Sequence, residues 1–384
     1  MSQSWSPLHA RLHQVLRSRQ LLPKHQRILV AVSGGQDSLC LIQLLLDLQP
    51  KWGWQVAIAH CNHRWRTDAD ANAEYVRGLA QTWGVPYHGL TVTETHTASV
   101  RTEAGARQWR YQVLAETAIA QGYGAIATGH TASDRAETLL YNLMRGSGTD
   151  GLQALTWQRS LPLPPIDKGR AGLESSTLQP PKNNITIVRP LLFMTRQETG
   201  EFCQSASLQP WLDSTNDDWR YARNRIRQDL LPYLQEHFNP GVEHNLAQTA
   251  EILQADVAYL EAETDKLWHQ VVDTNAPPNA PTPQLPDPPT PRPPNSPTPQ
   301  LPNSPTPQRP NALKLNRKLL TSAPLALQRR VLRRGLLSVL PKAPNFEQIE
   351  KLAALVTAPN RSQTDPFPGG AIARVAGDWI VVET

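Results

Sequence analysis

The sequence has 384 residues, of which 39% are hydrophobic, and this is enough for one large domain with a core and a smaller companion. Its 38 basic and 33 acidic side chains give a formal charge of +5, which is compatible with a polyanionic partner but defines no reaction. Three widely separated cysteines, Cys40, Cys61 and Cys203, exclude a disulfide framework and a four-thiolate metal site. We therefore expect a protein of the reducing cytoplasm.

The N-terminal stretch is expected to be an amphipathic helix rather than a signal peptide or a membrane span, because arginines interrupt it. From Arg27 to about Val188, short apolar runs then alternate with amphipathic stretches, which predicts an α/β fold with a doubly wound, mostly parallel sheet. The strands are expected at residues 28–33, 55–61, 87–92, 125–130 and 185–190. The helices between them are expected at residues 38–47, 70–83, 103–121 and 134–145. Ligands of such sheets bind beyond the carboxyl ends of the strands, where Ser33, His60 and His130 stand.

The stretch that follows Arg145 and reaches Asn184 is predicted to be a long surface loop, because it is rich in proline, serine and glycine. A domain boundary is expected near Asp217, where strands give way to long helices. The chain would then consist of a catalytic domain, residues 1–217, and a smaller helical domain, residues 218–384.

The smaller domain is interrupted by a proline-dense segment, residues 276–310, which cannot form helices or sheet ladders. We expect this segment to be extended, solvated and disordered. Further helices are expected at residues 324–340 and 347–356. A hairpin that turns at Gly377 and Asp378 is expected to end the chain.

Two glycines stand at the junction of the first strand and its helix, in the run Ser33-Gly34-Gly35-Gln36-Asp37-Ser38. Their missing side chains let backbone N–H groups approach a phosphate, and a helix N-terminus favours negative charge. The run is not a Walker loop, because no Gly-Lys-Ser/Thr follows. Asp37 would repel a bare phosphate, which indicates a bridging cation such as Mg²⁺. The alternative is a tight turn with Asp37 as a helix cap, which the order of strand, turn and helix disfavours.

This run resembles the SGGxDS loop of the PP-loop ATP pyrophosphatases, which cleave ATP between the α- and β-phosphates and activate a substrate as an adenylate. The resemblance implies an adenine nucleotide α-hydrolase-like fold. It also implies that residues 33–38 bind ATP and that Asp37 is catalytic.

Three further segments narrow the resemblance: HCNHRWR from His60, GHTASDRAETLLYNLMRGSG from Gly129, and DSTNDDWRYARNRIRQDLLPYL from Asp213. Together with the loop, they resemble the tRNA(Ile)-lysidine synthetase family. The resemblance implies a ligase that adenylates C2 of the wobble cytidine in the CAU anticodon of an isoleucine tRNA. Lysine then displaces AMP, and the cytidine becomes lysidine. The implied partners are this tRNA, lysine and ATP, and a homodimer is compatible with the family.

Asp134 and Glu137 are candidates for the lysine site and for catalysis. They lie three residues apart on one predicted helix face, directly after the strand end at His130. Two carboxylates there can hold an ammonium group, and one of them can take the proton that the amine sheds before attack. The alternative is a pair of solvated helix charges, which the position at a strand end disfavours.

Two further catalytic candidates, His130 and Arg110, are expected to hold the triphosphate or the adenylate, because arginine binds phosphates bidentately. His60 and His63 are a weak candidate for a zinc site, since no second ligand set lies at metal spacing. We expect them to line the pocket or pack beneath it.

Arginines at two places are candidates for tRNA binding. Arg223 and Arg225 stand at the entry to the helical domain, and Arg223 is expected to reach toward the active site. The second place is a predicted helix suited to phosphate contacts, with Arg329, Arg330, Arg333 and Arg334. A solvated arginine face is the alternative for that helix.

One departure from the family pattern concerns lysine binding: Ser133 stands where the family commonly has a first acid before Asp134. Two other functions stay open. A tRNA thiolase with the same loop would need a cysteine pair or an iron–sulfur cluster, against which the scattered cysteines argue. A non-catalytic RNA-binding protein would have lost the acids, but Asp37, Asp134 and Glu137 are all present.

Overall fold

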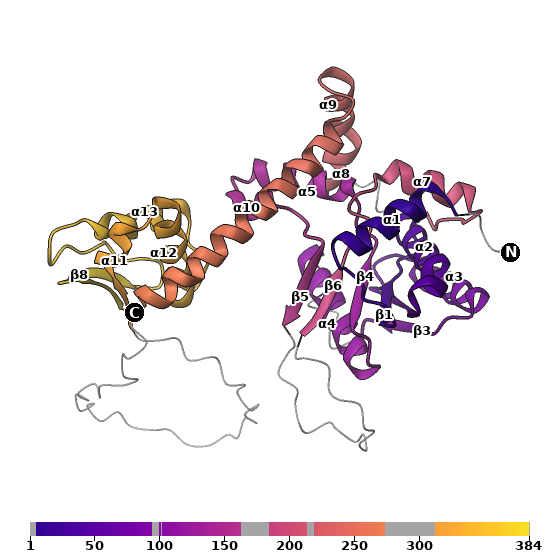
Figure 1. Cartoon of the computed structure of the whole chain (residues 1–384), viewed down its shortest axis with the longest axis horizontal. Coiled ribbons are helices and arrows are strands. Elements are labelled where there is room, and N and C mark those ends of the chain that lie inside the picture. The colour runs from indigo at the N-terminus through magenta and orange to yellow at the C-terminus, as the bar shows by residue number, and fades with distance from the viewer. Residues whose placement is uncertain are drawn as a thin grey trace, which may run out of the picture. The chain divides into compact units, whose positions relative to one another are not determined.

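The computed structural model describes residues 5–93, 100, 102–162, 184–212, 219–272 and 312–383. They form two compact units, one reaching Ala255 and the other starting at Asp256, and the long helix α10, Val242–Val271, belongs to both (Figure 1). The expected boundary near Asp217, the proline-dense segment and the D-S-T-N run from Asp213 lie outside the described residues. Among the described helices, none has both the length and the apolar character that crossing a membrane requires.

The first unit is built on a six-stranded sheet with the strand order β3-β2-β1-β4-β6-β5. Five strands are parallel and match the predicted ones: β1 (Arg27–Ala31), β2 (Gln55–Asn62), β3 (Tyr87–Thr91), β4 (Ala125–Thr128) and β6 (Asn184–Val188). The predicted α/β fold is therefore confirmed. The prediction of a loop after Arg145 was wrong in part, because β5 (Gln158–Pro162) pairs antiparallel with β6 at the sheet edge. Its polar sequence, QRSLP, lacks the apolar run that marked the other strands.

Both faces of the sheet are covered, because successive strand residues point to opposite sides. Ile28 and Val30 of β1 belong to a core with the helices of one face, whereas Leu29 belongs to a core with the other. The first face carries α1 (Pro7–Ser18), α2 (Gln36–Trp52), α3 (Ala69–Trp83) and α7 (Arg196–Ser205). The second face carries α4 (Glu103–Ala120).

A separate helical group follows the carboxyl end of β4. It consists of α5 (Ala132–Met144), α6 (Thr149–Leu152), α8 (Ala222–Arg225), a π-helical turn (Ile226–Leu230) and α9 (Leu231–His237). Ile226 and Leu231 pack against Ala136 and Leu140 of α5 in a small apolar core. This packing fixes the arginine-rich run from Ala222 beside α5.

The second unit contains α11 (Arg317–Ser322), α12 (Leu325–Val339), α13 (Phe346–Ala353) and the strands β7 (Ala312–Asn316), β8 (Ile372–Ala376) and β9 (Trp379–Glu383). The two predicted helices and the hairpin are present, and Gly377 at its turn has a φ of 61°. The expectation that no strand precedes the hairpin was wrong. β7 pairs with β9 to give a three-stranded sheet, and its leucines Leu313 and Leu315 enter the core.

Candidate active site

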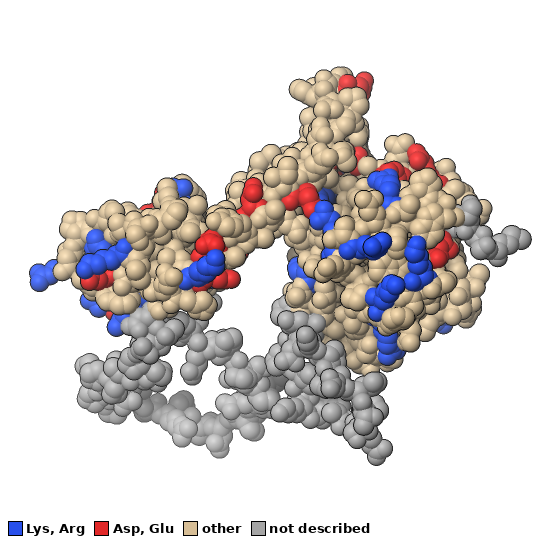
Figure 2. Space-filling model, in the orientation of Figure 1, with Lys and Arg blue, Asp and Glu red and all other residues tan. Residues whose placement is uncertain are grey.

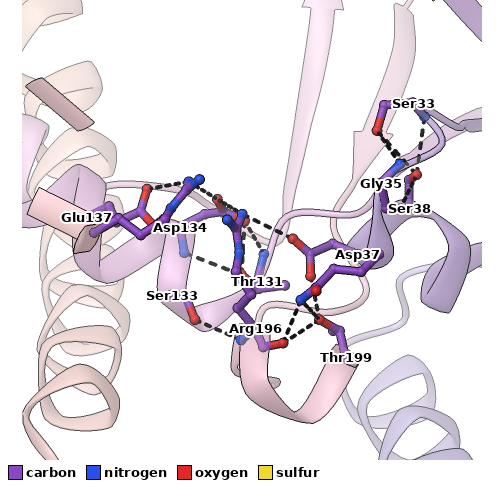
Figure 3. A network of polar contacts seen from close by, with 12 residues as sticks. Ser33, Gly35, Asp37, Ser38, Thr131, Ser133, Asp134, Glu137, Arg196 and Thr199 are labelled. Atoms are coloured by element: carbon purple, nitrogen blue, oxygen red, sulfur yellow. Dashed lines mark hydrogen bonds and ion pairs between the residues drawn. The ribbon is translucent and has the colours of Figure 1, made fainter. Parts of the chain in front are cut away.

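The glycine-rich loop joins β1 to α2 and is fixed from several sides (Figure 3). Ser38 Oγ donates to the Gly35 carbonyl at 2.8 Å and accepts from the Ser33 backbone N–H at 3.2 Å. Asn72 of α3 donates to the Ser33 carbonyl at 3.0 Å, and the Trp211 N–H donates to the Gly34 carbonyl at 2.9 Å. The loop is therefore preorganised, and the first turn of α2 presents its N–H groups to an anion.

Neighbouring atoms come so close to the backbone at two positions around this loop that only glycine fits there. Gly34 has a φ of +91°, and a Cβ there would come within 2.5 Å of Asn72 Oδ1. Gly129 follows β4, and a Cβ there would lie 2.9 Å from the backbone carbonyl of Asp37. Gly129 thus lets the end of β4 meet the start of α2, so that residues after both strands share one site.

Asp37 lies in the first turn of α2 and faces α7 (Figure 3). The Thr199 hydroxyl donates to its Oδ1, and Arg196 Nη2 lies 3.1 Å from its Oδ2. The same Arg196 nitrogen lies 3.6 Å from Asp134 Oδ1. One guanidinium group therefore stands between the two predicted catalytic aspartates. Neither Arg196 nor Thr199 was predicted, since the sequence around α7 carried no recognised motif.

Asp134 is fixed by the N-terminal cap of α5. Its Oδ2 accepts hydrogen bonds from the Thr131 backbone N–H at 2.8 Å and from the Thr131 hydroxyl at 2.9 Å. Its Oδ1 lies 3.6 Å from Arg196 and 3.9 Å from Arg227, which is longer than a hydrogen bond. Asp134 Oδ1 can thus accept a further cationic donor.

Ser133 is buried and links three helices. Its hydroxyl donates to Glu243 in the first turn of α10 and accepts from the Arg196 backbone N–H at 2.8 Å. The position where an acid was expected therefore contacts a carboxylate from a distant segment, Glu243, which no sequence motif had indicated.

Glu137 is only 2% exposed and forms a bidentate pair with Arg227. Arg227 Nε lies 2.6 Å from Glu137 Oε1, and Nη2 lies 2.9 Å from Oε2. Arg227 was not among the predicted site residues, although it ends the R-N-x-I-R segment. The nearby predicted arginines differ: Arg225 is exposed and donates to the Trp219 carbonyl at 3.3 Å, and Arg223 is partly buried.

The three acids differ in their protonation equilibria. Burial raises the pKa of Asp37 although Arg196 opposes the shift, and burial likewise raises the pKa of Glu137 against the effect of Arg227. Burial alone would also raise the pKa of Asp134, but the positive charge of Arg196 and the Thr131 hydrogen-bond donors act against it, and this pKa is lowered. Asp134 is therefore the most firmly ionised acid, whereas Glu137 takes up a proton more readily.

The predicted histidines lie at or near the carboxyl ends of β2 and β4, and Arg110 lies in α4. His130 Nδ1 is 2.9 Å from the Thr128 hydroxyl, and burial lowers the His130 pKa to about 3. His60 Nδ1 donates to the Val32 carbonyl at 2.9 Å. Arg110 Nη2 donates to His63 Nε2 at 3.2 Å, so Arg110 is held next to His63 rather than next to the carboxylates.

The predicted arginines of α12 lie in the second unit and are engaged there. Arg329 forms a bidentate pair with Glu350 at 2.7 and 2.9 Å, and Arg330 pairs with Glu261. Arg334 lies 3.0 Å from Glu261 and 2.6 Å from Asp265. Arg333 also has a polar or electrostatic partner. Figure 2 shows blue and red side chains next to one another on this unit.

Comparisons with known proteins place the chain in a family. Residues 6–234, more than half of the chain, match the PP-loop domain family, and residues 315–379 match the TilS substrate binding domain. A tRNA(Ile)-lysidine synthase from Nostoc sp. is 54% identical over 98% of this chain and 97% of its own length. The chain belongs to the tRNA(Ile)-lysidine synthase family. The resemblance inferred from the motifs is thereby confirmed.

A second relative supports the same conclusion. The tRNA(Ile)-lysidine synthase from Synechocystis sp. is 45% identical over 98% of both chains.

A solved structure resembles the fold of this chain. The U34-tRNA thiolase NcsA from Methanococcus maripaludis has a TM-score of 0.50 and 15% identity, with 64% of this chain and 78% of that chain covered. This likeness shows the fold alone, so it does not favour the thiolase alternative.

Proposed function

We propose that this chain uses ATP to adenylate C2 of the wobble cytidine of a CAU-anticodon isoleucine tRNA and then joins lysine to that carbon. The products are lysidine, AMP and pyrophosphate. The observation that carries the proposal is the network of Asp37, Asp134 and Glu137 with Arg196 and Arg227, beside the phosphate loop. It combines an anion site for ATP with carboxylates for an ammonium group.

ATP is proposed to lie on the loop of residues 33–38, with its phosphates on the N-terminal turn of α2. The carboxylates of Asp37 and Asp134 both face one guanidinium group, that of Arg196, so the space between the two aspartates suits a cation. Mg²⁺ usually binds one or two carboxylates together with substrate phosphates, and Asp37 would hold it here. When bound, Mg²⁺ would neutralise phosphate charge. Arg196 would then turn from Asp37 toward the phosphates.

Lysine is proposed to bind with its ε-ammonium group on Asp134 Oδ1, the carboxylate oxygen that has no hydrogen bond shorter than 3.5 Å in the described residues. Glu137 has the raised pKa that suits a proton acceptor. The amine nitrogen forms the bond to C2, the bond from C2 to the AMP oxygen breaks, and the amine proton passes to Glu137. Neutral His130 and Arg110 are proposed to contact the adenylate.

The test is incubation with ATP, labelled lysine and CAU-anticodon tRNA. Label on the tRNA and release of AMP are expected. Label from a sulfur donor without lysine, or no AMP, would contradict the proposal. Asp134→Asn is expected to raise the KM for lysine about tenfold or more, since one charged hydrogen bond is lost. The exposed Glu201→Gln on α7 serves as a control with unchanged kinetics.

A further inference from the structure

A second group of polar residues gathers at the carboxyl end of the sheet, beyond His130. We call Arg107, Tyr111, Arg159 and Arg189 the rim cluster. Arg107 and Tyr111 lie one turn apart in α4, Arg159 lies in β5, and Arg189 follows β6. None of these four residues belongs to the ATP, lysine or tRNA sites assigned above.

Arg189 is the most unusual member, because it is a charged residue that is only 2% exposed. Its Nη1 donates to the Thr156 carbonyl at 2.6 Å, and its backbone N–H donates to the Trp157 carbonyl at 2.8 Å. Its Nε is buried and has no hydrogen-bond partner among the described residues. A buried guanidinium with an unsatisfied N–H carries a desolvation cost that an anion would offset.

Tyr111 is enclosed by the other members. The guanidinium of Arg107 lies 5.4 Å from the centre of its ring, and that of Arg159 lies 5.3 Å from it. Burial by itself would raise the pKa of the Tyr111 hydroxyl, but Arg107 and Arg189 outweigh it, so the net shift is downward. The neighbouring arginines therefore favour the ionised form of the phenol.

In the parts of the chain that the structure describes, Arg107, Arg159 and Arg189 form no salt bridge with an acid. Arg159 is exposed and Arg107 is partly exposed, so the cluster runs from a buried guanidinium to solvent. Three arginines and a phenol at such an edge match the donors that bind phosphate in nucleic acids.

We propose that the rim cluster binds a backbone phosphate of the tRNA next to the cytidine that is modified. The inference rests on the proposed function, because it needs an RNA whose reacting base lies at Asp134 and His130. β4 and β6 are neighbouring strands with Ala127 opposite Val188, so Arg189 and His130 follow adjacent strand ends. A nucleotide held there through its phosphate would be aligned with the lysine site.

A phosphate of ATP is the other source of the same chemistry, and the sheet order disfavours it. The ATP loop follows β1, whereas Arg189 follows β6 and Arg159 lies in β5, with β4 between β1 and β6. Neighbouring strands are about 4.8 Å apart, so the cluster begins roughly 10 Å from the loop across the sheet. Arg159 is exposed on the edge strand β5. It is therefore more accessible to a large ligand such as RNA than to a triphosphate bound at the start of α2.

The experiment uses Arg159→Gln and Arg107→Gln in the full chain, because Arg189 is buried and its replacement would disturb folding. The matched control is Arg77→Gln, which removes another arginine that stacks on a tyrosine, Tyr87, at 5.5 Å. Binding of a CAU anticodon stem-loop RNA is measured by fluorescence anisotropy at several salt concentrations. The KM values for tRNA and ATP are measured in parallel.

Each rim variant is expected to weaken RNA binding about 3- to 10-fold and to lower the slope of log K against log salt concentration by about 0.7–0.9. The KM for ATP should stay unchanged, as should all values of Arg77→Gln. An unchanged RNA affinity in both rim variants would overturn the proposal, and so would a raised KM for ATP with normal RNA binding. Because RNA binding is measured without catalysis, failure of lysine transfer in the wild type would refute the proposed function alone.

Discussion

Two arginine-rich regions of this protein have opposite surroundings. In α12 of the second unit, Arg329, Arg330 and Arg334 pair with Glu350, Glu261 and Asp265. In the rim cluster of the first unit, Arg107, Arg159 and Arg189 have no carboxylate partner among the described residues. The number of arginines in a sequence segment therefore does not tell how much positive potential a polyanion meets there, because acidic partners can neutralise those arginines.

The salt bridges show two uses of arginine within the protein. Arg196 and Arg227 pair with acids of the candidate active site, whereas the arginines of α12 tie α12 to α10 and α13. The rim arginines are proposed to serve a third use, the binding of an external anion. RNA that binds α12 would have to compete with Glu261 and Glu350. The role of Arg329, Arg330 and Arg333 in tRNA binding therefore stays a prediction. The strength of the competition from these acids can be measured by replacing them.

The largest effect is expected where an arginine neutralises a buried acid. Arg227→Ala leaves Glu137 buried without its bidentate partner, so it should lower the free energy of unfolding by about 3–5 kcal/mol. Urea unfolding checks this value. Arg225→Ala is the matched control, because Arg225 lies on the same helical run but is exposed, and it should change stability by less than about 0.5 kcal/mol.

The double variant Arg227→Ala with Glu137→Gln sharpens this test. If the loss comes from an uncompensated charge, the second change should recover part of the stability, since a neutral amide costs less to bury. Equal losses in Arg227→Ala and Arg225→Ala would show that pairing with Glu137 contributes little.

The next effect separates ATP chemistry from RNA binding. Asp37→Asn removes the charge that faces Arg196 and the proposed Mg²⁺, so it should lower AMP release at least about 100-fold. Its affinity for the stem-loop RNA should stay within about twofold, since neither arginine-rich region is changed. Asp47→Asn, on the same helix and bonded to His9 and Gln43, is the control. A normal rate of AMP release would show that the loop is misassigned.

The sequence predicted the fold well because its signals are local. Apolar runs marked five strands, and the two glycines of the SGGQDS run marked the turn between the first strand and its helix. The partners of the site acids were missed because they come from afar: Arg227 is 90 residues from Glu137, Thr199 is 162 residues from Asp37, and Glu243 is 110 residues from Ser133. The spacing of apolar residues in a sequence reports local structure, so it cannot reveal contacts between residues this far apart. β5 was missed for a related reason, since an edge strand with one covered face needs no apolar run.

A smaller effect is expected from freeing the arginines of α12. Glu261→Gln removes the acid shared by Arg330 and Arg334, so RNA affinity at low salt should rise about 2- to 5-fold if α12 contacts RNA. Stability should fall by less than about 1 kcal/mol, because the pair is partly exposed. Anisotropy titrations with full-length tRNA measure the affinity. An affinity that does not change would place the RNA contacts of the second unit elsewhere than α12.

The smallest effect concerns His63, which would add positive charge beside Arg110 if it were protonated. Burial lowers the His63 pKa to about 4, below the unfolded value near 6.5, with Arg110 acting in the same direction. Between pH 6.5 and 4 the unfolded chain therefore binds more protons at this residue, and stability falls as the pH falls. The urea midpoint of His63→Gln should drop less from pH 7 to pH 5 than that of the wild type. Equal drops would mean that His63 takes up its proton in the folded state, where the imidazolium would add to the positive charge of Arg110.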